Sequence, residues 1–145
     1  MKDQVFRVEY FAFTADDKPG VGANYGERLK QEGVNLLGIL AFPATPGKVQ
    51  VDLIPENPET LTKAARKIGI TLGPPKTAFL VQGTDRPGAV GEVLGRLGNA
   101  NINVRATTGV CGGGNRYGAL IWVDQANTEA AARALGATTM AARHV

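Results

Sequence analysis

Two short segments of this sequence carry the residues best suited to bind a small charged molecule. Residues 85–88 are Asp-Arg-Pro-Gly and residues 17–20 are Asp-Lys-Pro-Gly, so an acid, a base, a proline and a glycine follow in the same order. Proline fixes φ and glycine tolerates almost any backbone angle, so each segment predicts a turn that opens a helix. Asp85 offers an acceptor for an ammonium group, and the glycine lets a ligand approach the backbone.

The backbone at such a turn also suits an anion. A helix that opens at Gly88 leaves the N–H groups of Gly88, Ala89 and Val90 without intrahelical partners and with partial positive charge. A ligand carboxylate is a natural partner for these groups, and Asn103 can hydrogen-bond either end of the ligand. The alternative is structural, with each Asp capping its helix and each Pro-Gly making the turn.

The other reactive side chains do not form a catalytic set. Cys111 has no visible base partner and the single histidine, His144, lies near the C-terminal end, so a catalytic Cys-His pair is not expected. Residues 111–115 begin Cys-Gly-Gly-Gly but lead into a strand, which excludes a P-loop and predicts a flexible hairpin loop. Metal-ligand spacing and paired carboxylates are missing. We expect no enzyme activity, no catalytic residues, no cofactor and no metal.

Composition indicates a soluble globular protein, with 43% apolar and 20% charged residues among 145. The net charge of +3 arises in residues 76–145, which carry 7 Lys and Arg against 4 Asp and Glu, while residues 1–75 carry 9 of each. These cations are dispersed, so no nucleic-acid partner is expected. A membrane span, a signal pattern and a cysteine framework are missing, which predicts a cytoplasmic protein without a membrane partner.

Apolar periodicity and turn residues predict one order of elements twice. The first copy comprises a strand at 5–13, a helix at 21–32, strands at 36–42 and 49–54, a helix from Pro58 to Ile68 and a strand at 70–72. The second comprises a strand at 78–81, a helix at 88–97, strands at 105–110 and 117–123, a helix at 128–135 and a strand at 138–142. Gly73-Pro74-Pro75 is the linker, which places one module at 1–73 and the other at 76–145.

The two copies align without a gap at a spacing of 68 residues. Gly20 falls on Gly88, Leu29 on Leu97 and Asn35 on Asn103. Each copy is βαββαβ, so the predicted fold class is α+β: a ferredoxin-like module duplicated in tandem, with antiparallel sheets and helices on one face.

Two glycines in the first predicted helix share one face. Gly22 and Gly26 are four residues apart, and each weakens the helix by roughly 1 kcal/mol relative to Ala. We expect this face to pack closely against the sheet or the other module, and close approach of a ligand is the alternative.

The strand, the Asp-Lys/Arg-Pro-Gly turn, the amphipathic helix and the Asn before the next strand resemble the ACT domain. That family consists of small βαββαβ modules that bind amino acids and regulate metabolic enzymes. The resemblance covers nearly the whole chain and implies a stand-alone tandem protein, non-catalytic and allosteric, that senses an amino acid and forms a homodimer. It leaves open a ligand-free subunit that docks on an amino-acid biosynthetic enzyme.

The resemblance also implies where the ligand lies, between the turn of one module and the second strand or first helix of a neighbour. The corresponding residues of this chain belong to two sites. They are Asp85, Arg86, Pro87, Gly88, Ala89, Val90 and Asn103 in the second module, and Asp17, Gly20, Val21 and Asn35 in the first.

Overall fold

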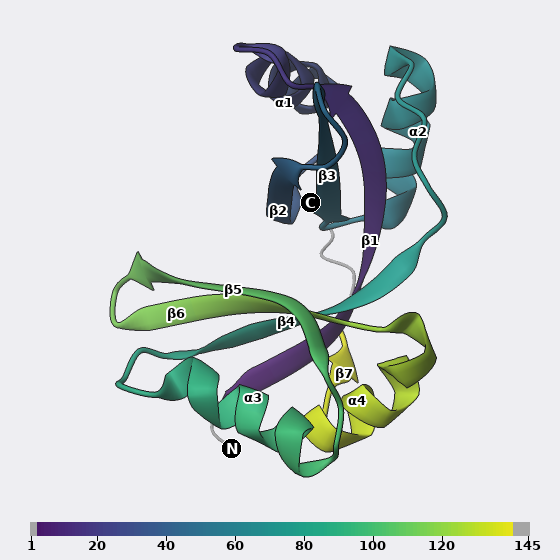
Figure 1. Ribbon diagram of the computed structural model, residues 1–145. Coiled ribbons are helices and arrows are strands. Elements are labelled where there is room, and N and C mark those ends of the chain that lie inside the picture. Colours follow the sequence, from purple (N-terminus) through teal and green to yellow (C-terminus); the bar gives the residue numbers. More distant parts are fainter. Residues whose placement is uncertain (1–2, 141–145) are drawn as a thin grey trace. The chain divides into compact units, whose positions relative to one another are not determined.

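The computed structural model describes residues 3–140, which form two compact units (Figure 1). The first unit comprises residues 9–76, and the second combines residues 3–8 with 77–140. Strand β1 (Gln4–Asp16) contributes its first part to the second unit and the remainder to the first. Sequence periodicity groups residues 3–8 with the first module, because alternation identifies a strand without naming the sheet that it joins.

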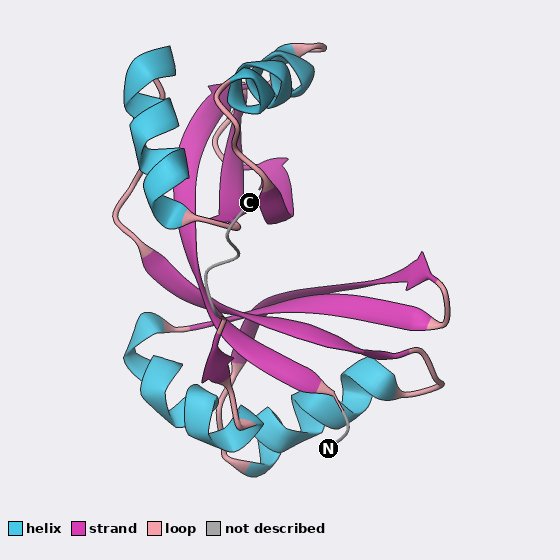
Figure 2. Ribbon diagram, turned by 180° about the vertical axis from the view of Figure 1, so that it is seen from behind, coloured by secondary structure: helices cyan, strands magenta, loops and turns pink. Residues whose placement is uncertain are grey.

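The first unit contains a three-stranded antiparallel sheet in the order β2-β3-β1. Strands β2 (Leu36–Pro43) and β3 (Lys48–Pro55) form a hairpin, and helices α1 (Val21–Gln31) and α2 (Pro58–Ile68) contact one another. Figure 2 shows both helices beside these strands. Their apolar faces form one core, whose buried members include Phe11, Phe13, Leu29, Leu53 and Leu61.

The second unit repeats this plan and adds the N-terminal strand. Strand β4 (Lys76–Thr84) pairs with β6 (Arg116–Val123), and β6 pairs with β5 (Val104–Gly113), all antiparallel. The first part of β1 is the next strand after β4, and β7 (Thr138–Thr139) runs parallel to it at Phe6 and Arg7. Helices α3 (Ala89–Asn99) and α4 (Thr128–Leu135), the latter preceded by the short 3-10 helix η1 (Gln125–Asn127), lie along one face of the sheet (Figure 1).

The spacing of 68 residues holds in the strand pairing. Phe11 pairs with Leu53 in the first unit, and Phe79 pairs with Ile121 in the second. The fold is therefore the predicted α+β arrangement of a repeated module, with the order βαββα within residues 9–76 and βαββαβ from β4 to β7. Within residues 3–140, no helix is long and apolar enough to span a bilayer.

Local chemistry explains where the helices begin. The Asn57 side chain accepts hydrogen bonds from the N–H groups of Glu59 and Thr60 at 3.0 and 3.4 Å, and Pro58 takes the first helical position of α2. Gly20 and Gly88 precede α1 and α3 with φ of 86° and 79°. This left-handed conformation explains why both turns end in glycine.

The structure corrects three predicted elements. Ile70-Thr71-Leu72 is not a strand. Ile70 is buried because it packs on the core, and not because it pairs with another strand. A backbone hydrogen bond to β1 follows only at Gly73, whose N–H donates to Ala12 O at 2.8 Å. Cys111, Gly112 and Gly113 belong to β5 rather than to a loop, and Cys111 pairs with Tyr117. The last predicted strand is limited to Thr138–Thr139, and its positions 141 and 142 lie outside the described residues.

Candidate functional site

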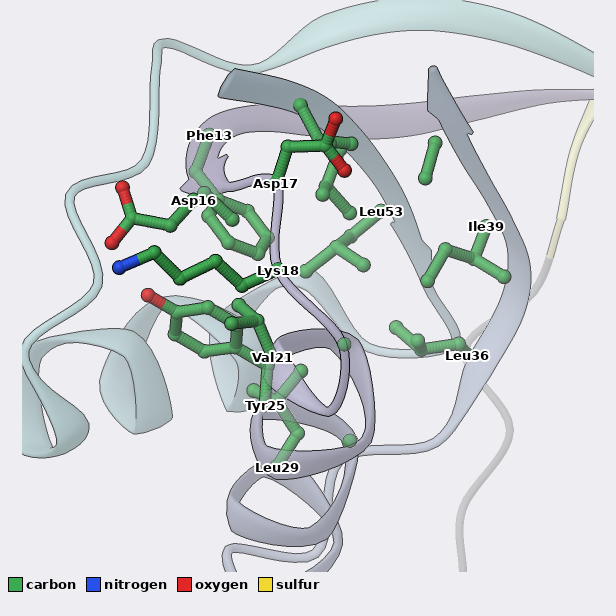
Figure 3. A pocket seen from close by; sticks show the side chains of 16 residues that line it. Phe13, Asp16, Asp17, Lys18, Val21, Tyr25, Leu29, Leu36, Ile39 and Leu53 are labelled. Atoms are coloured by element: carbon green, nitrogen blue, oxygen red, sulfur yellow. The ribbon is translucent and has the colours of Figure 1, made fainter. Parts of the chain in front are cut away.

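An apolar pocket of about 180 Å³ lies in the first unit, beneath the turn that opens α1. Helix α1 forms one wall and strands β1, β2 and β3 form the others (Figure 3). Its apolar lining consists of Phe13, Ala15, Val21, Tyr25, Leu29, Leu36, Ile39, Ala41, Val49, Val51 and Leu53. The rings of Phe13 and Tyr25 meet edge to face, with centroids 5.1 Å apart. Such a wall favours an apolar group over a polar one.

Gly22 and Gly26 also line this pocket. A Cβ atom added at either glycine would meet no heavy atom within 4 Å. The prediction of close packing on this face is therefore wrong for the described chain. The glycines border open space, which agrees with the alternative that a ligand approaches there.

Charged groups occur at the turn end of the pocket, where Asp16, Asp17 and Lys18 line it. Asp16 pairs with Lys48 at 2.5 Å, and the Lys48 ammonium, assisted by Lys18, holds the pKa of Asp16 below its usual value. Asp17 donates its backbone N–H to Gly47 O at 3.0 Å, which ties the turn to the β2–β3 hairpin. Figure 3 shows the carboxylates of Asp16 and Asp17 directed to different sides of the turn. The pocket thus combines an apolar interior with charges of both signs at one end.

The second turn opens a larger and more open hollow of about 400 Å³ in the second unit. Its lining is more polar and comprises Asp85, Arg86, Gly88, Ala89, Val90, Gly91, Gly109, Val110, Cys111 and Tyr117. The Asp85 carboxylate raises the pKa of the Cys111 thiol by hydrogen bonding, which lowers the thiolate fraction.

Arg86 is already engaged by the protein's own acids. Its Nη1 and Nη2 donate to the two carboxylate oxygens of Asp3 at 3.1 Å each, Nη2 also donates to Glu92 at 2.6 Å, and Nη1 donates to Thr84 O at 3.0 Å. The Tyr117 hydroxyl donates to Asp3 at 2.7 Å. We call Asp3, Arg86 and Tyr117 the Asp3 clamp.

The clamp is built into the packing of the second unit. The Asp3 side chain is 1% exposed, and a Cβ at Gly83 would lie 2.0 Å from its Oδ1. The guanidinium of Arg86 lowers the pKa of Asp3 against the opposing effect of burial. Burial and the adjacent Asp3 charge raise the pKa of Tyr117 to about 12, so this hydroxyl stays a donor.

The structure brings together some of the residues that the sequence singles out. Asp17 and Val21 line the first pocket, and Asp85, Arg86, Gly88, Ala89 and Val90 line the second. Ala89 donates its N–H to Arg86 O at 3.3 Å, so this group is partly satisfied within the turn.

Four other predicted positions lie outside these linings. Gly20 precedes α1, and Pro87 lies within its turn. The Asn35 side chain donates to Glu56 at 2.6 Å, and Asn103 is exposed before β5. Sequence analysis missed the walls on β2 and β3 and also missed Asp3. For the apolar interior of the pocket, the local signal in the sequence was the Gly22 and Gly26 pair, whereas the turn motif indicated its charged end.

Comparisons with known proteins place the chain by its fold. No family model matches the sequence, and no curated protein matches it significantly. A solved structure from Bacteroides thetaiotaomicron has a TM-score of 0.77 at 17% identity and covers 91% of this chain and 88% of that chain. The regulatory subunit of aspartate kinase from Thermus thermophilus, ligand-free, has a TM-score of 0.61 at 17% identity. The regulatory subunit of aspartate kinase from Thermus flavus has a TM-score of 0.52 at 16% identity. Each of these two alignments covers 94% of this chain and 95% of the subunit.

The fold is ACT-like. The same arrangement of helices and strands serves as a regulatory subunit in the two Thermus proteins. At such low identity the likeness establishes the fold alone, and function has to be argued from the site.

Proposed function

We propose that this protein is a non-catalytic regulator that binds an amino acid in its first unit and acts on amino-acid metabolism. The observation that carries the proposal is the pocket beneath the first turn, where an apolar interior ends at Asp16, Asp17 and Lys18. A free amino acid has the complementary form, with charges of both signs at one end and a side chain at the other. The fold shared with regulatory subunits of aspartate kinase supports a regulatory role.

In this proposal the turn holds the charged end of the ligand. The α-ammonium lies near Asp17, and the α-carboxylate lies near Lys18 and the N-terminus of α1, where the helix dipole favours an anion. Lys18 forms no ion pair with another residue of the described range 3–140. Its charge is therefore available to a ligand, in contrast to that of Arg86.

A second candidate is a ligand-free subunit that docks on a biosynthetic enzyme. It is favoured by apolar side chains on the outer strands of the described sheet order. Ile39 and Phe42 on β2 are 58% and 38% exposed, and Val110 on β5 is 71% exposed. The same edges support the proposal that two tandem ACT-like chains associate as a homodimer.

Thermal unfolding against the twenty amino acids at millimolar concentration tests the proposal. A ligand at ~100 times its dissociation constant stabilises the native state by about 2.7 kcal/mol, which raises the midpoint by roughly several degrees. We expect one or a few related amino acids to raise it. A flat panel would favour the docking subunit, and the next experiment would then be co-purification with the partner enzyme.

A further inference from the structure

We infer that the ligand is an amino acid with a bulky apolar side chain, leucine-like or phenylalanine-like, and that this side chain enters the first unit beneath α1. The inference rests on the proposed function and names the ligand class of the same pocket. The space lies within one unit, between a helix and the sheet that it covers. It does not need a neighbouring module to complete its apolar walls.

The second unit shows how the inner part of this space is filled by side chains, while its turn end remains a hollow lined by Asp85, Arg86 and Val90. At the spacing of 68 residues, Gly22 and Gly26 of α1 correspond to Val90 and Leu94 of α3. Val90 and Leu94 pack against the core of the second unit. In the first unit the same helix face lacks both side chains, and a Cβ there would enter open space.

The correspondence is structural as well as sequential. Leu29 and Leu97, one turn further along each helix, are both buried in their respective cores. Opposite the helix, Ile39 pairs with Leu53 as Thr107 pairs with Ile121. The two helix faces are therefore matched positions of one fold, and the glycines remove side chains from one of them.

Other matched positions change the shape of the space without closing it. Phe13 and Tyr25 replace Val81 and Val93, which adds aromatic surface to the walls, while the smaller Val49 replaces Tyr117. The remaining pocket of about 180 Å³ leaves room for an apolar group between the helix and the strands.

The walls also select against polar and small side chains. The charged lining residues Asp16, Asp17 and Lys18 all lie at the turn end of the pocket, so apart from the Tyr25 hydroxyl the rest of the lining is apolar. A polar side chain would lose water and gain few partners in return, and a small one would leave the walls without contacts. One methylene alone changes discrimination by ~10-fold or more in such pockets. We expect leucine or phenylalanine to bind at least ~10-fold more tightly than serine or glycine.

Gly26→Leu tests where the side chain lies, because it supplies the leucine that the second unit carries at position 94. In the absence of ligand this variant should unfold at a higher temperature, since leucine is the better helix former and gains apolar contacts. It should also abolish the midpoint shift and the calorimetric heat that L-leucine or L-phenylalanine give with the native sequence. Loss of binding in a more stable protein cannot be ascribed to misfolding.

Gly95→Leu is the matched control. It introduces the same residue at an exposed glycine of α3, where a Cβ also meets no atom within 4 Å, and Gly95 does not line the first pocket. It should retain the full response to L-leucine and L-phenylalanine.

The outcomes separate this inference from the proposed function. If serine or glycine binds as tightly as leucine, or if Gly26→Leu keeps the native response, the inference is wrong and amino-acid sensing stands. If no amino acid binds the native protein, both are wrong, and a higher midpoint for Gly26→Leu would then identify the pocket as a packing defect.

Discussion

At the scale of single residues, the two turns differ in what their basic residue does. Arg86 is committed to Asp3 and Glu92, whereas Lys18 makes no ion pair within the described range. One position of the repeat has thus taken a structural role in the second unit, and its counterpart keeps its charge for other partners. We expect ligand binding at the first turn to be independent of the second.

The Asp3 clamp predicts a pH dependence of stability. Because Arg86 lowers the pKa of Asp3 in the folded protein, the clamp contributes stability above the usual pKa of an aspartate, near 3.8, and this contribution is lost as the pH falls further. Asp3→Asn should lower the free energy of unfolding at pH 7 by about 1–3 kcal/mol and reduce its acid dependence. Denaturant unfolding at pH 7 and pH 3 measures both effects.

Glu9→Gln is the control for this prediction, since Glu9 is an exposed acid of the same strand. It should leave the free energy of unfolding nearly unchanged at either pH. Equal pH dependence in Asp3→Asn and the native protein would show that the clamp contributes nothing.

At the scale of elements, Gly83 on β4 is the position that admits the N-terminal segment. A Cβ there would lie 2.0 Å from Asp3 Oδ1 and 2.8 Å from the Tyr117 ring. Gly83→Ala should therefore cost about 1–3 kcal/mol of stability through overpacking. The repeat supports this view. The matched position of the first unit is Ala15, which has a Cβ, and Asp3, which leaves no room for one at Gly83, belongs to the second unit.

Gly118→Ala provides the comparison for Gly83→Ala by thermal unfolding. Gly118 on β6 pairs with Gln82 on β4, and a Cβ at Gly118 would meet Val81 O at an ordinary 3.7 Å. A midpoint for Gly83→Ala as high as that for Gly118→Ala would contradict the overpacking argument.

The elements themselves were largely predictable, because their signals are local. Asn57-Pro58 fixes the start of α2, and the left-handed φ of Gly20 and Gly88 explains the repeated Pro-Gly. Ile70 misled the strand prediction, since packing on the core produces the same apolar alternation as a sheet. At Cys111 the error was the reverse, a strand predicted as a loop. The glycine-rich run that begins there suggests a loop, although its backbone pairs with β6.

The candidate site was less predictable, because its walls come from segments distant in the sequence. The turn residues could be found from their spacing, and Asp17 and Asp85 do line pockets. Gly22 and Gly26 permitted either close packing or open space, and only the positions of β2 and β3 decide between them. Asp3 carries no local signal at all, since its role depends on Arg86, a residue 83 positions away.

At the scale of the whole molecule, residues 3–8 should be required by the second unit. Val5 is 4% exposed in that unit's core, and Phe6 and Arg7 pair with β7. Deletion of residues 1–8 should therefore reduce the hydrogen-exchange protection of residues 77–140 while residues 9–76 keep most of theirs. Unchanged hydrogen-exchange protection of β4 and β6 in the deletion variant would refute this prediction. A synthetic peptide of residues 1–8 should restore the protection of residues 77–140 in part.

The division of β1 between two units has a consequence for how the chain is made. Residues 3–8 are synthesised before the rest of the described chain, and they join a sheet whose other strands, β4 to β7, follow only after residue 75. The unit at 9–76 has its residues available early, whereas the N-terminal segment waits with its backbone groups unpaired until the remainder emerges. Because contacts between such distant segments form slowly, completion of the second unit should limit the rate of folding.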